Sequence, residues 1–193
     1  NPNKFKIREI KNHKNICKIM AKELSNSKIV AWHQGRAEFG PRALGNRSIL
    51  ADPRKLNIKK ILNQKIKNRD NFRPFAPSVL DKYAKDYFFL SSKYEYNYMN
   101  CTSKVKQNKV SQIPAVINID KTARIQIVSK KNNINYYNLI NHFYKLTGVP
   151  MLLNTSLNID EPISNTCEDS IQIFLKSKID FLVIENFIIS RIQ

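Results

Sequence analysis

Residues 34 to 54 read Gln34-Gly35-Arg36-Ala37-Glu38-Phe39-Gly40-Pro41-Arg42-Ala43-Leu44-Gly45-Asn46-Arg47-Ser48-Ile49-Leu50-Ala51-Asp52-Pro53-Arg54. This stretch holds four arginines and three of the four glycines in the whole chain. Glycine lets a backbone approach a ligand closely and adopt positive φ, and guanidinium groups bind phosphate or carboxylate oxygens through paired, charge-assisted hydrogen bonds. The composition therefore predicts an anion-binding loop.

The segments on either side of this loop predict an α/β fold. Apolar residues at helical spacing indicate a helix over residues 11–25, and the apolar run at residues 29–32 indicates a strand that leads into the loop. Residues 48–51 are predicted as the next short strand, and residues 58–66 as a second helix. Strands mixed with helices in this rhythm indicate a sheet covered by helices.

The rest of the chain continues this alternation. Further helices are predicted at residues 139–146, ended by Thr147-Gly148, and 168–176, with Thr166 as the N-cap. Further strands are predicted at residues 79–80, 113–119, 124–128, 151–153, 181–184 and 187–189, with 120–122 as the turn between the second and third of these. Residues 67–77 are predicted to be irregular, because Pro74 and Pro77 exclude a helix. Residues 83–112 stay open between a mobile insertion and packed structure.

Size and composition indicate a single domain over residues 1–193. No apolar run approaches the roughly 20 residues that cross a bilayer, so no membrane partner is expected. The start lacks an initiator Met and a signal-like segment, so we expect a piece of a longer protein. Three scattered cysteines favour a reducing, cytoplasmic setting over a disulfide framework or a cysteine metal site: Cys17, Cys101 and Cys167. The histidines are equally scattered and are expected on the surface or in the core: His13, His33 and His142.

The formal net charge of +18 alone favours a nucleic-acid partner. Most of the excess is lysine spread with asparagine and isoleucine along the whole chain, without the interleaved aromatic residues of a stacking surface. Arginine behaves differently, because it clusters in the loop and returns at Arg69, Arg73 and Arg124. We therefore expect small anionic ligands and no nucleic acid.

Three more polar clusters follow the ends of predicted strands or helices, where open α/β sheets place their ligands. The first spans residues 67–77, in which Lys67 and Arg69 would share one side of an extended chain and Pro74 restricts Arg73. The others are Asp120-Lys121-Thr122-Ala123-Arg124 and Asn154-Thr155-Ser156-Leu157-Asn158. Each alone has an ordinary reading as solvated arginines or as a turn. Together they predict one shared pocket.

This set of residues favours charge neutralisation over covalent catalysis. The sequence shows no His/Asp or Cys/His nucleophile arrangement, no P-loop and no dinucleotide fingerprint. Asp52, Asp120 and Glu161 have the chemistry to hold a metal, but Asp52 before Pro53 and Glu161 before Pro162 fit turns at least as well, so no metal ligands are predicted. Several fixed positive charges beside amides and hydroxyls suit the positioning of phosphate-bearing reactants.

Four blocks of the sequence resemble the C-terminal domain of the O-carbamoyltransferases, the NodU/CmcH group. They occur in the right order over nearly the whole chain, and the first is long and specific. They are Gly35-Arg36 through Arg54, Phe72-Arg73-Pro74-Phe75-Ala76-Pro77, Thr122-Ala123-Arg124-Ile125-Gln126, and Asn154-Thr155-Ser156-Leu157-Asn158 with Glu161-Pro162-Ile163. Lys67-Asn68-Arg69 and Ser156-Leu157-Asn158 also resemble the Lys-x-Arg and Ser-x-Asn pairs of YrdC-like proteins.

This resemblance implies a YrdC-like α/β domain with a twisted mixed sheet flanked by helices. It implies binding of carbamoyl phosphate and ATP, and formation of carbamoyl-adenylate with release of phosphate and pyrophosphate. A larger N-terminal Kae1-like domain, absent from this chain, would pass the carbamoyl group to a hydroxyl of a sugar or natural product. Mg²⁺ is expected with ATP, because it bridges phosphates.

The resemblance also assigns site residues by position. The core of the site is carried over as Lys67, Arg73, Arg124 and Ser156, with Arg42 as a further phosphate ligand, and a second set of substrate- or ATP-binding residues as Arg36, Arg47, Arg69, Asn154 and Asn158. The arginines are expected to neutralise charge on the phosphates, Lys67 to bridge the two reactants, and Ser156 to orient the carbamoyl group.

Three departures from the family pattern stand out: Lys121 in place of glycine, Asn118 in place of histidine, and Leu157 in place of phenylalanine. The first affects the loop that presents Arg124. Two other function classes stay open at this point, a basic RNA-binding module and a non-catalytic anion-binding domain that supports a partner. The acceptor is not predicted, because its contacts would belong mainly to the missing domain.

Overall fold

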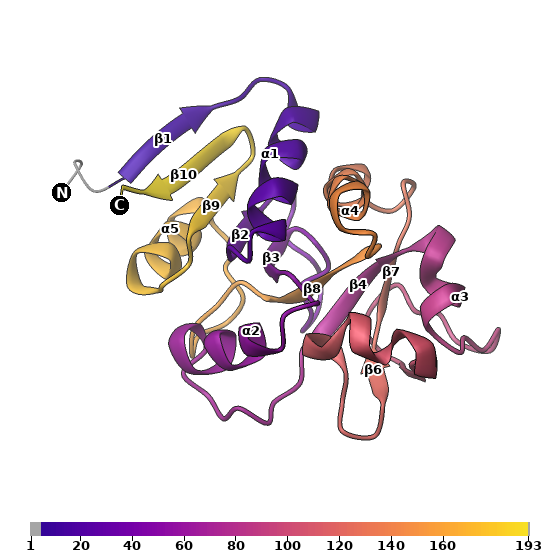
Figure 1. Cartoon of the computed structure of the whole chain (residues 1–193). Helices are drawn as coiled ribbons and strands as arrows, with labels where there is room; N and C mark the ends of the chain where they lie inside the picture. The colour runs from indigo at the N-terminus through magenta and orange to yellow at the C-terminus, as the bar shows by residue number, and fades with distance from the viewer. Residues whose placement is uncertain (1–4, 193) are drawn as a thin grey trace.

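A computed structural model describes residues 5–192 as an eight-stranded mixed sheet with helices packed against it (Figure 1). The strands are β1 (Phe5–Glu9), β2 (Val30–His33), β3 (Arg47–Ala51), β4 (Ala76–Leu80), β5 (Thr102–Lys104), β6 (Thr122–Arg124), β7 (Gln126–Val128), β8 (Met151–Ser156), β9 (Phe181–Ile184) and β10 (Phe187–Arg191). The main sheet has the order β1-β10-β9-β2-β3-β8-β4-β7, and β5 and β6 form a separate pair. The β2–β9 and β4–β7 pairs are parallel and the others antiparallel, which confirms the predicted mixed sheet.

The α-helices are α1 (His13–Ser25), α2 (Leu56–Ile61), α3 (Ala84–Tyr87), α4 (Ile134–Thr147) and α5 (Cys167–Lys176). Short 3₁₀ turns occupy Asp81–Tyr83, Gln107–Gln112 and Pro114–Val116, and a π-helical turn, Leu62–Ile66, extends α2. None of the helices within residues 5–192 is both long enough and apolar enough to cross a membrane.

Helices cover both faces of the sheet. Neighbouring residues of a strand point to opposite faces. On β2, the Trp32 ring lies against His13 of α1, with ring centroids 5.7 Å apart, while His33 Nδ1 lies 2.7 Å from Ser170 Oγ of α5. Helices α1 and α4 lie side by side on the first of these faces (Figure 1).

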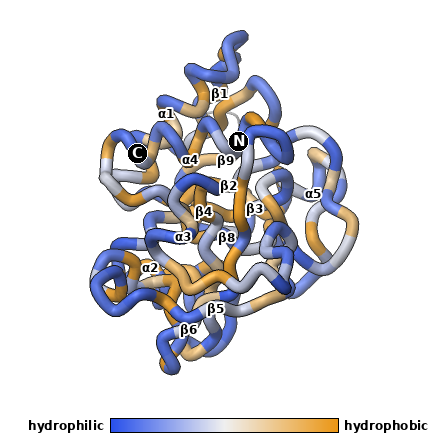
Figure 2. The backbone as a smooth tube through the Cα atoms, turned by 90° about the vertical axis from the view of Figure 1, so that its right-hand side faces the viewer, coloured by the Kyte–Doolittle hydropathy of each residue, from blue (hydrophilic) through white to orange (hydrophobic). Residues whose placement is uncertain are grey.

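The core fills the space between these layers. Trp32, Leu50, Phe143 and Leu152 have no exposed surface. Figure 2 shows the apolar segments concentrated in the central strands, while the connecting loops are mostly hydrophilic. Burial of this apolar surface is the main force that holds the sheet and helices together.

Two predicted helix ends are confirmed, the N-cap of α5 at Thr166 and the end of α4 at Gly148, whereas the cap of α1 at Asn12 was not predicted. Asn12 caps α1 by accepting from the backbone N–H of Lys14, and Thr166 caps α5 in a capping box with Asp169. Helix α4 ends at Gly148, whose φ of 73° is the left-handed conformation that favours glycine. The two predicted ends depend on local chemistry, which is why the sequence predicts them.

The predicted hairpin of residues 113–119 and 124–128 is wrong. Residues Pro114–Val116 form a 3₁₀ turn, and the backbone N–H of Ala115 donates to Pro53 O. The clean alternation of the second segment is divided between two sheets, because β6 pairs with β5 and β7 pairs with β4. The proline, which offers no backbone N–H, removes the first segment from any ladder.

One further segment was left open by the sequence, and one further strand was not predicted. Residues 83–112 are packed structure, since Phe88, Tyr96 and Met99 are buried within it. Strand β1 was not predicted, because its burial pattern is exposed at four of five positions. At an edge paired with β10, it needs no continuous apolar face.

Candidate anion-binding site

The predicted clusters meet in one cleft at the end of β8. It has a volume of about 80 Å³ and receives residues from the 34–46 loop, from the segment before β4, from β6 and from β8. Its lining comprises Pro41, Arg42, Ala43, Arg69, Pro74, Phe75, Ala76, Met99, Arg124, Asn154, Thr155 and Ser156. Antiparallel pairing of β8 with both β3 and β4 places Asn154 at the centre of this arrangement, opposite Leu50 and Ala76.

A carboxylate organises the loop that supplies Arg42. Glu38 Oε1 accepts from the backbone N–H groups of Leu44 and Asn46, each at 2.7 Å, and more weakly from that of Arg47 at 3.3 Å. These bonds fold the loop back on itself. The loop conformation therefore depends on Glu38, which the sequence analysis did not single out although it lies within the quoted block.

Arg47 holds the same loop through hydrogen bonds to its backbone carbonyls. It is buried, and its guanidinium donates to the backbone carbonyls of Gln34, Gly35, Asn46 and Asn165 at 3.0 to 3.3 Å. Its side chain lies outside the cleft lining, and these bonds occupy its terminal nitrogens. Arg47 thus fixes the loop instead of facing a ligand.

Gly45 seats the loop on α4. A Cβ at this position would lie 2.2 to 2.8 Å from ring atoms of Tyr136, and the φ of Gly45 is 108°. Both the close approach and the positive φ require glycine. Tyr136 is fully buried, so the loop rests on a rigid surface.

Arg42, Arg69 and Arg124 bring positive charge to the cleft. Burial lowers the pKa of Arg124, and the neighbouring Arg42 lowers it further. Burial likewise lowers the pKa of Arg69, with added repulsion from Arg73 and Arg124. The Nε atom of Arg124 is buried without a hydrogen-bond partner. An anion bound here would relieve this repulsion and supply an acceptor.

Arg69 is held in place from two sides. Its Nε donates to Asn63 Oδ1 at 2.7 Å, and its guanidinium carbon lies 4.8 Å from the ring centre of Phe75. The chain reaches this point by a turn, since Lys67 ends the π-helical turn and Asn68 has a φ of 45°. The expectation of an extended chain with Lys67 and Arg69 on one side is therefore wrong.

Lys67 lies directly behind Ser156. Its buried ammonium donates to Ser156 O, to Asn158 Oδ1 at 2.7 Å and to Asn158 O at 2.9 Å, with Ser156 Oγ at 3.4 Å. Ser156 Oγ in turn donates to Asn158 Oδ1 at 2.6 Å. Burial, together with the nearby positive charge of Arg69 and against the opposing effect of Asp160, lowers the pKa of Lys67 to about 7. Lys67 thus fixes the Ser-x-Asn segment that forms one wall.

The remaining predicted residues lie at or beyond the rim. Arg73 is exposed and lines an adjoining hollow of about 580 Å³ together with Arg69, Asp70 and Asp160. Asn158 lines a second hollow of about 490 Å³, which shares Pro41 and Ser156 with the cleft. Arg36 is exposed and is not among the residues that line any of these three spaces.

The family of the chain follows from comparison with known proteins. Residues 21–191 match the family described as Carbamoyltransferase C-terminus. The chain belongs to this family. The carbamoyltransferase C-terminal domain is 43% identical over 185 residues to nodulation protein NolNO of Sinorhizobium fredii, covering 95% of this chain and 27% of that protein. It is 42% identical to NolO of Bradyrhizobium diazoefficiens, covering 95% and 34%. It thus spans about a third or less of these curated relatives.

Solved structures show the fold of this carbamoyltransferase C-terminal domain. Sua5 of P. abyssi, complexed with L-threonine, superposes with a TM-score of 0.63 at 12% identity, covering 90% of this chain and 47% of that one. E. coli YciO gives a TM-score of 0.61 at 13% identity, covering 92% and 81%. Full-length HypF in its phosphate- and nucleotide-bound form gives 0.56 at 17% identity, covering 97% and 22%. The predicted YrdC-like fold is confirmed.

The departure at Lys121 leaves the carbamoyltransferase C-terminal site assembled. Lys121 has a φ of 60°, the left-handed region in which glycine is favoured, so the family's usual glycine has a local reason. The turn is held by Asp120 Oδ1, which accepts from the Thr122 hydroxyl at 2.7 Å and from its backbone N–H at 3.0 Å. Arg124 still reaches the cleft.

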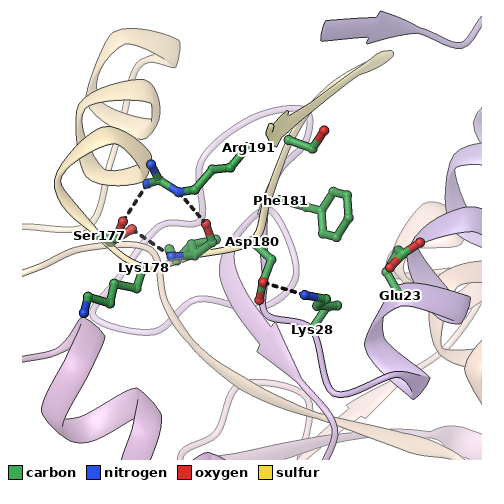
Figure 3. A pocket seen from close by; sticks show the side chains of 9 residues that line it. Glu23, Lys28, Ser177, Lys178, Asp180, Phe181 and Arg191 are labelled. Atoms are coloured by element: carbon green, nitrogen blue, oxygen red, sulfur yellow. Dashed lines mark hydrogen bonds and ion pairs between the residues drawn. The ribbon is translucent and has the colours of Figure 1, made fainter. Parts of the chain in front are cut away.

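A larger hollow of about 670 Å³ in the same carbamoyltransferase C-terminal domain lies between α1, α5, β9 and β10 (Figure 3). We call it the distal hollow. Its Arg191 donates to Phe174 O, Ser177 O and Ile179 O, and its Lys28 pairs with Asp180 at 3.2 Å. These charges already have partners.

Sequence reasoning missed a buried amide cluster beneath the cleft. Ser78 of β4 and Gln126 of β7 are buried and contact Asn154 of β8. Gln126 ends one of the quoted family blocks, which was its only signal. Among residues 5–192, no group of three or more histidine, cysteine, aspartate or glutamate side chains is placed to hold a metal ion.

Proposed function

We propose that this chain is the carbamoyl-activating domain of an O-carbamoyltransferase. It binds carbamoyl phosphate and ATP and forms carbamoyl-adenylate. The N-terminal Kae1-like domain of the full-length enzyme then passes the carbamoyl group to a hydroxyl of a sugar or natural-product acceptor. The observation that carries this proposal is the convergence of Arg42, Arg69 and Arg124 with Asn154 and Ser156 in one small cleft.

The spaces around the cleft support two reactants. The cleft itself suits a small acyl phosphate, because its three arginines neutralise a phosphate in a partly buried place. The adjoining hollows share Arg69 on one side, and Pro41 and Ser156 on the other, so a nucleotide can lie next to the acyl phosphate. The fold likeness to HypF, whose structure holds phosphate and nucleotide, is consistent with this assignment.

Release of both phosphate and pyrophosphate requires two steps, a hydrolysis of carbamoyl phosphate and an adenylation of the carbamate that it yields. Water cleaves carbamoyl phosphate into carbamate and phosphate, and a carbamate oxygen then attacks the α-phosphorus of ATP as pyrophosphate leaves. The arginines stabilise charge on the phosphoryl oxygens in both steps. Lys67 bridges the two reactants through Ser156, which lines the cleft, and Asn158, which lines the next hollow.

Magnesium fits the hollow that contains Arg73. Asp70 and Asp160 line it, and Mg²⁺ is commonly held by one or two carboxylates together with substrate phosphates. The ion would neutralise charge on the ATP phosphates there. The chain's own contribution is to position the reactants and to neutralise charge on their phosphates with the arginines of the cleft.

A turnover assay tests this proposal. The purified chain is incubated with ATP, Mg²⁺ and carbamoyl phosphate, and AMP-containing products and pyrophosphate are measured. We expect turnover that requires carbamoyl phosphate and is lost in Lys67→Ala and Arg124→Ala. Lys178→Ala, an exposed lysine of the distal hollow, is the matched control and should keep wild-type turnover.

Three other outcomes discriminate between the function classes. Saturable ATP binding without turnover would show that the chain needs its N-terminal domain or only supports it. The same assay on the full-length protein with Arg73→Glu separates these two cases, because a supporting domain would leave turnover intact. Steeply salt-dependent RNA binding without ATP binding would replace the proposal with an RNA-binding function.

A further inference from the structure

The buried amide cluster fixes the orientation of Gln126. Its Nε2 lies 2.7 Å from Leu44 O, a backbone carbonyl that only accepts hydrogen bonds. The amide nitrogen of Gln126 must therefore face Leu44. Its Oε1 then faces β4 and β8, where it accepts from Ser78 Oγ at 2.6 Å.

The orientation of Asn154 follows from its three acceptors. Asn154 Nδ2 lies 3.1 Å from Ala43 O, 3.0 Å from Ser78 Oγ and 3.2 Å from Gln126 Oε1. The first is a carbonyl, the second has its proton directed at Gln126, and the third is an oxygen by the argument above. A flipped amide would place Oδ1 against three oxygens, so Nδ2 occupies this side.

The other amide atom of Asn154 is left without a partner. Asn154 is 1% exposed, and its Oδ1 is buried with no hydrogen bond. A buried carbonyl oxygen without a donor is destabilising, because it has lost its hydrogen bonds to water and gained none in return. Asn154 lines the same cleft as Arg42, Arg69 and Arg124, so a residue with an unmet acceptor belongs to the wall of the arginine site.

The cleft thus offers two different things to a ligand. Its guanidinium groups bind an anion, and Asn154 Oδ1 binds an N–H donor. Phosphate alone, or an acyl phosphate that ends in a methyl group, satisfies only the first. An acyl phosphate that carries an amino group on its carbonyl carbon satisfies both.

We propose that Asn154 Oδ1 accepts a hydrogen bond from the amino group of carbamoyl phosphate and thereby selects it over acyl phosphates that lack an N–H. Gln126 and Ser78 are positioning residues, because they hold the Asn154 amide in the orientation that presents Oδ1. This inference deepens the proposed function and rests on it. The selection works by a gained hydrogen bond, since only an amino group supplies the donor that the buried oxygen lacks in the ligand-free chain.

A pair of stable analogues tests this selection by calorimetry. Phosphonoacetamide carries the amino group, and 2-oxopropylphosphonate carries a methyl group in its place. We expect the wild-type chain to bind the amide about 10- to 100-fold more tightly, which is the value of one buried hydrogen bond. Inorganic phosphate, bound by the arginines alone, should compete with both analogues.

Variants separate selection from stability. Asn154→Ala should bring the ratio of the two dissociation constants close to one while the methyl analogue and phosphate keep their wild-type affinities. Gln126→Ala should reduce the ratio in part, because the Asn154 amide loses one restraint. Gln112→Ala is the matched control, since Gln112 is exposed and accepts from Tyr87 instead.

Each outcome decides the inference. Should Asn154→Ala fail to fold, Ser78→Ala removes one hydroxyl from the cluster and should still lower the ratio. Equal binding of the two analogues by the wild-type chain would overturn the role of Asn154 while leaving the arginine site intact. An unchanged ratio in folded Asn154→Ala would do the same. Failure of the wild-type chain to bind phosphate or either analogue would overturn the proposed function itself, and this inference with it.

Discussion

The cleft that holds Arg42, Arg69 and Arg124 (the arginine cleft) and the distal hollow are both basic. They differ in how many of their charged and polar groups have hydrogen-bond partners within the chain. In the distal hollow, Arg191 donates to the carbonyls of Phe174, Ser177 and Ile179, and Lys28 pairs with Asp180. Figure 3 shows the ion pair and the bonds to the last two of these carbonyls. In the cleft, the Nε of Arg124 and the Oδ1 of Asn154 are buried without partners. The distal hollow is the larger, at about 670 Å³ against about 80 Å³. Size is therefore a poor guide to the site, and the two regions differ in whether their charged and polar groups have partners within the chain.

The difference has a thermodynamic reason. Folding normally pairs buried polar groups, because an unpaired one costs about 1 to 3 kcal/mol. Burial lowers the pKa values of Arg69 and Arg124, and repulsion from neighbouring arginines lowers them further. This cost remains in the ligand-free chain and is recovered when an anion binds. In the distal hollow, the same kinds of groups pair within the chain and therefore stabilise the fold.

The largest effects, on phosphate affinity and on the free energy of unfolding, are expected from replacing one arginine by glutamine in each region. Arg124→Gln should weaken phosphate binding about 100-fold or more, because it removes a preorganised charged donor, and it should leave the melting temperature unchanged or higher. Arg191→Gln should lower the free energy of unfolding by about 2 to 3 kcal/mol, because three carbonyls lose their donor, with phosphate affinity unchanged. Calorimetric titration and denaturant unfolding measure the two quantities. A loss of binding in Arg191→Gln would erase the distinction between the regions.

A smaller effect is expected in the pH dependence of stability. Burial lowers the pKa of Lys67 to about 7, well below its value of 10.5 in the unfolded chain. Between these values the unfolded chain binds more protons, so the free energy of unfolding should rise with pH, by at most about 1.4 kcal/mol per unit.

Denaturant unfolding at pH 7, 8 and 9 measures this slope. Lys67→Met should lose the part of the rise that Lys67 contributes, whereas Lys178→Met, at an exposed position of the distal hollow, should keep the wild-type slope. Equal slopes in the wild type and Lys67→Met would show that the buried lysine is not destabilised by its charge.

The smallest effect is expected for Lys28→Ala. The Lys28–Asp180 pair spans 3.2 Å, but the two side chains are 36% and 31% exposed, so solvent screens it. Asp180 also accepts from the backbone N–H of Ile29 at 2.9 Å, and this bond remains in the variant. The free energy of unfolding should fall by less than about 1 kcal/mol, with phosphate affinity unchanged. A twofold or greater loss of affinity would show that the distal hollow communicates with the cleft.

Much of the fold was predictable because its signals are local. Helix α5 begins at the capping box of Thr166 and α4 ends at Gly148, and both signals involve residues within one helical turn. The hairpin prediction failed because the alternation of residues 124–128 does not reveal that β6 and β7 join different sheets. Pairing partners are distant in sequence, so no local pattern identifies them.

The predicted site residues likewise include some that line the cleft and some that do not. Arg42, Arg69, Arg124 and Ser156 meet in the cleft as expected, since family blocks and arginine clustering both indicated them. Arg47 has the same residue type and lies in the same block, yet its guanidinium bonds to backbone carbonyls. An arginine that binds a ligand and one that holds a loop are alike in sequence. Only the partners within reach distinguish them.

The sequence by itself determined the α/β class, the helix ends, the family and the arginine-rich loop, because each depends on residue types at short spacing. The tertiary structure alone decided which charges remain free. Pairing of β8 with β3 and β4, and of β4 with β7, brings Asn154, Ser78 and Gln126 together from three separate segments. These contacts orient the buried amide of Asn154 and leave its oxygen without a hydrogen-bond donor. Hydrogen bonding has a reach of about 3 Å, so its outcome is settled only when distant parts of the chain are in place.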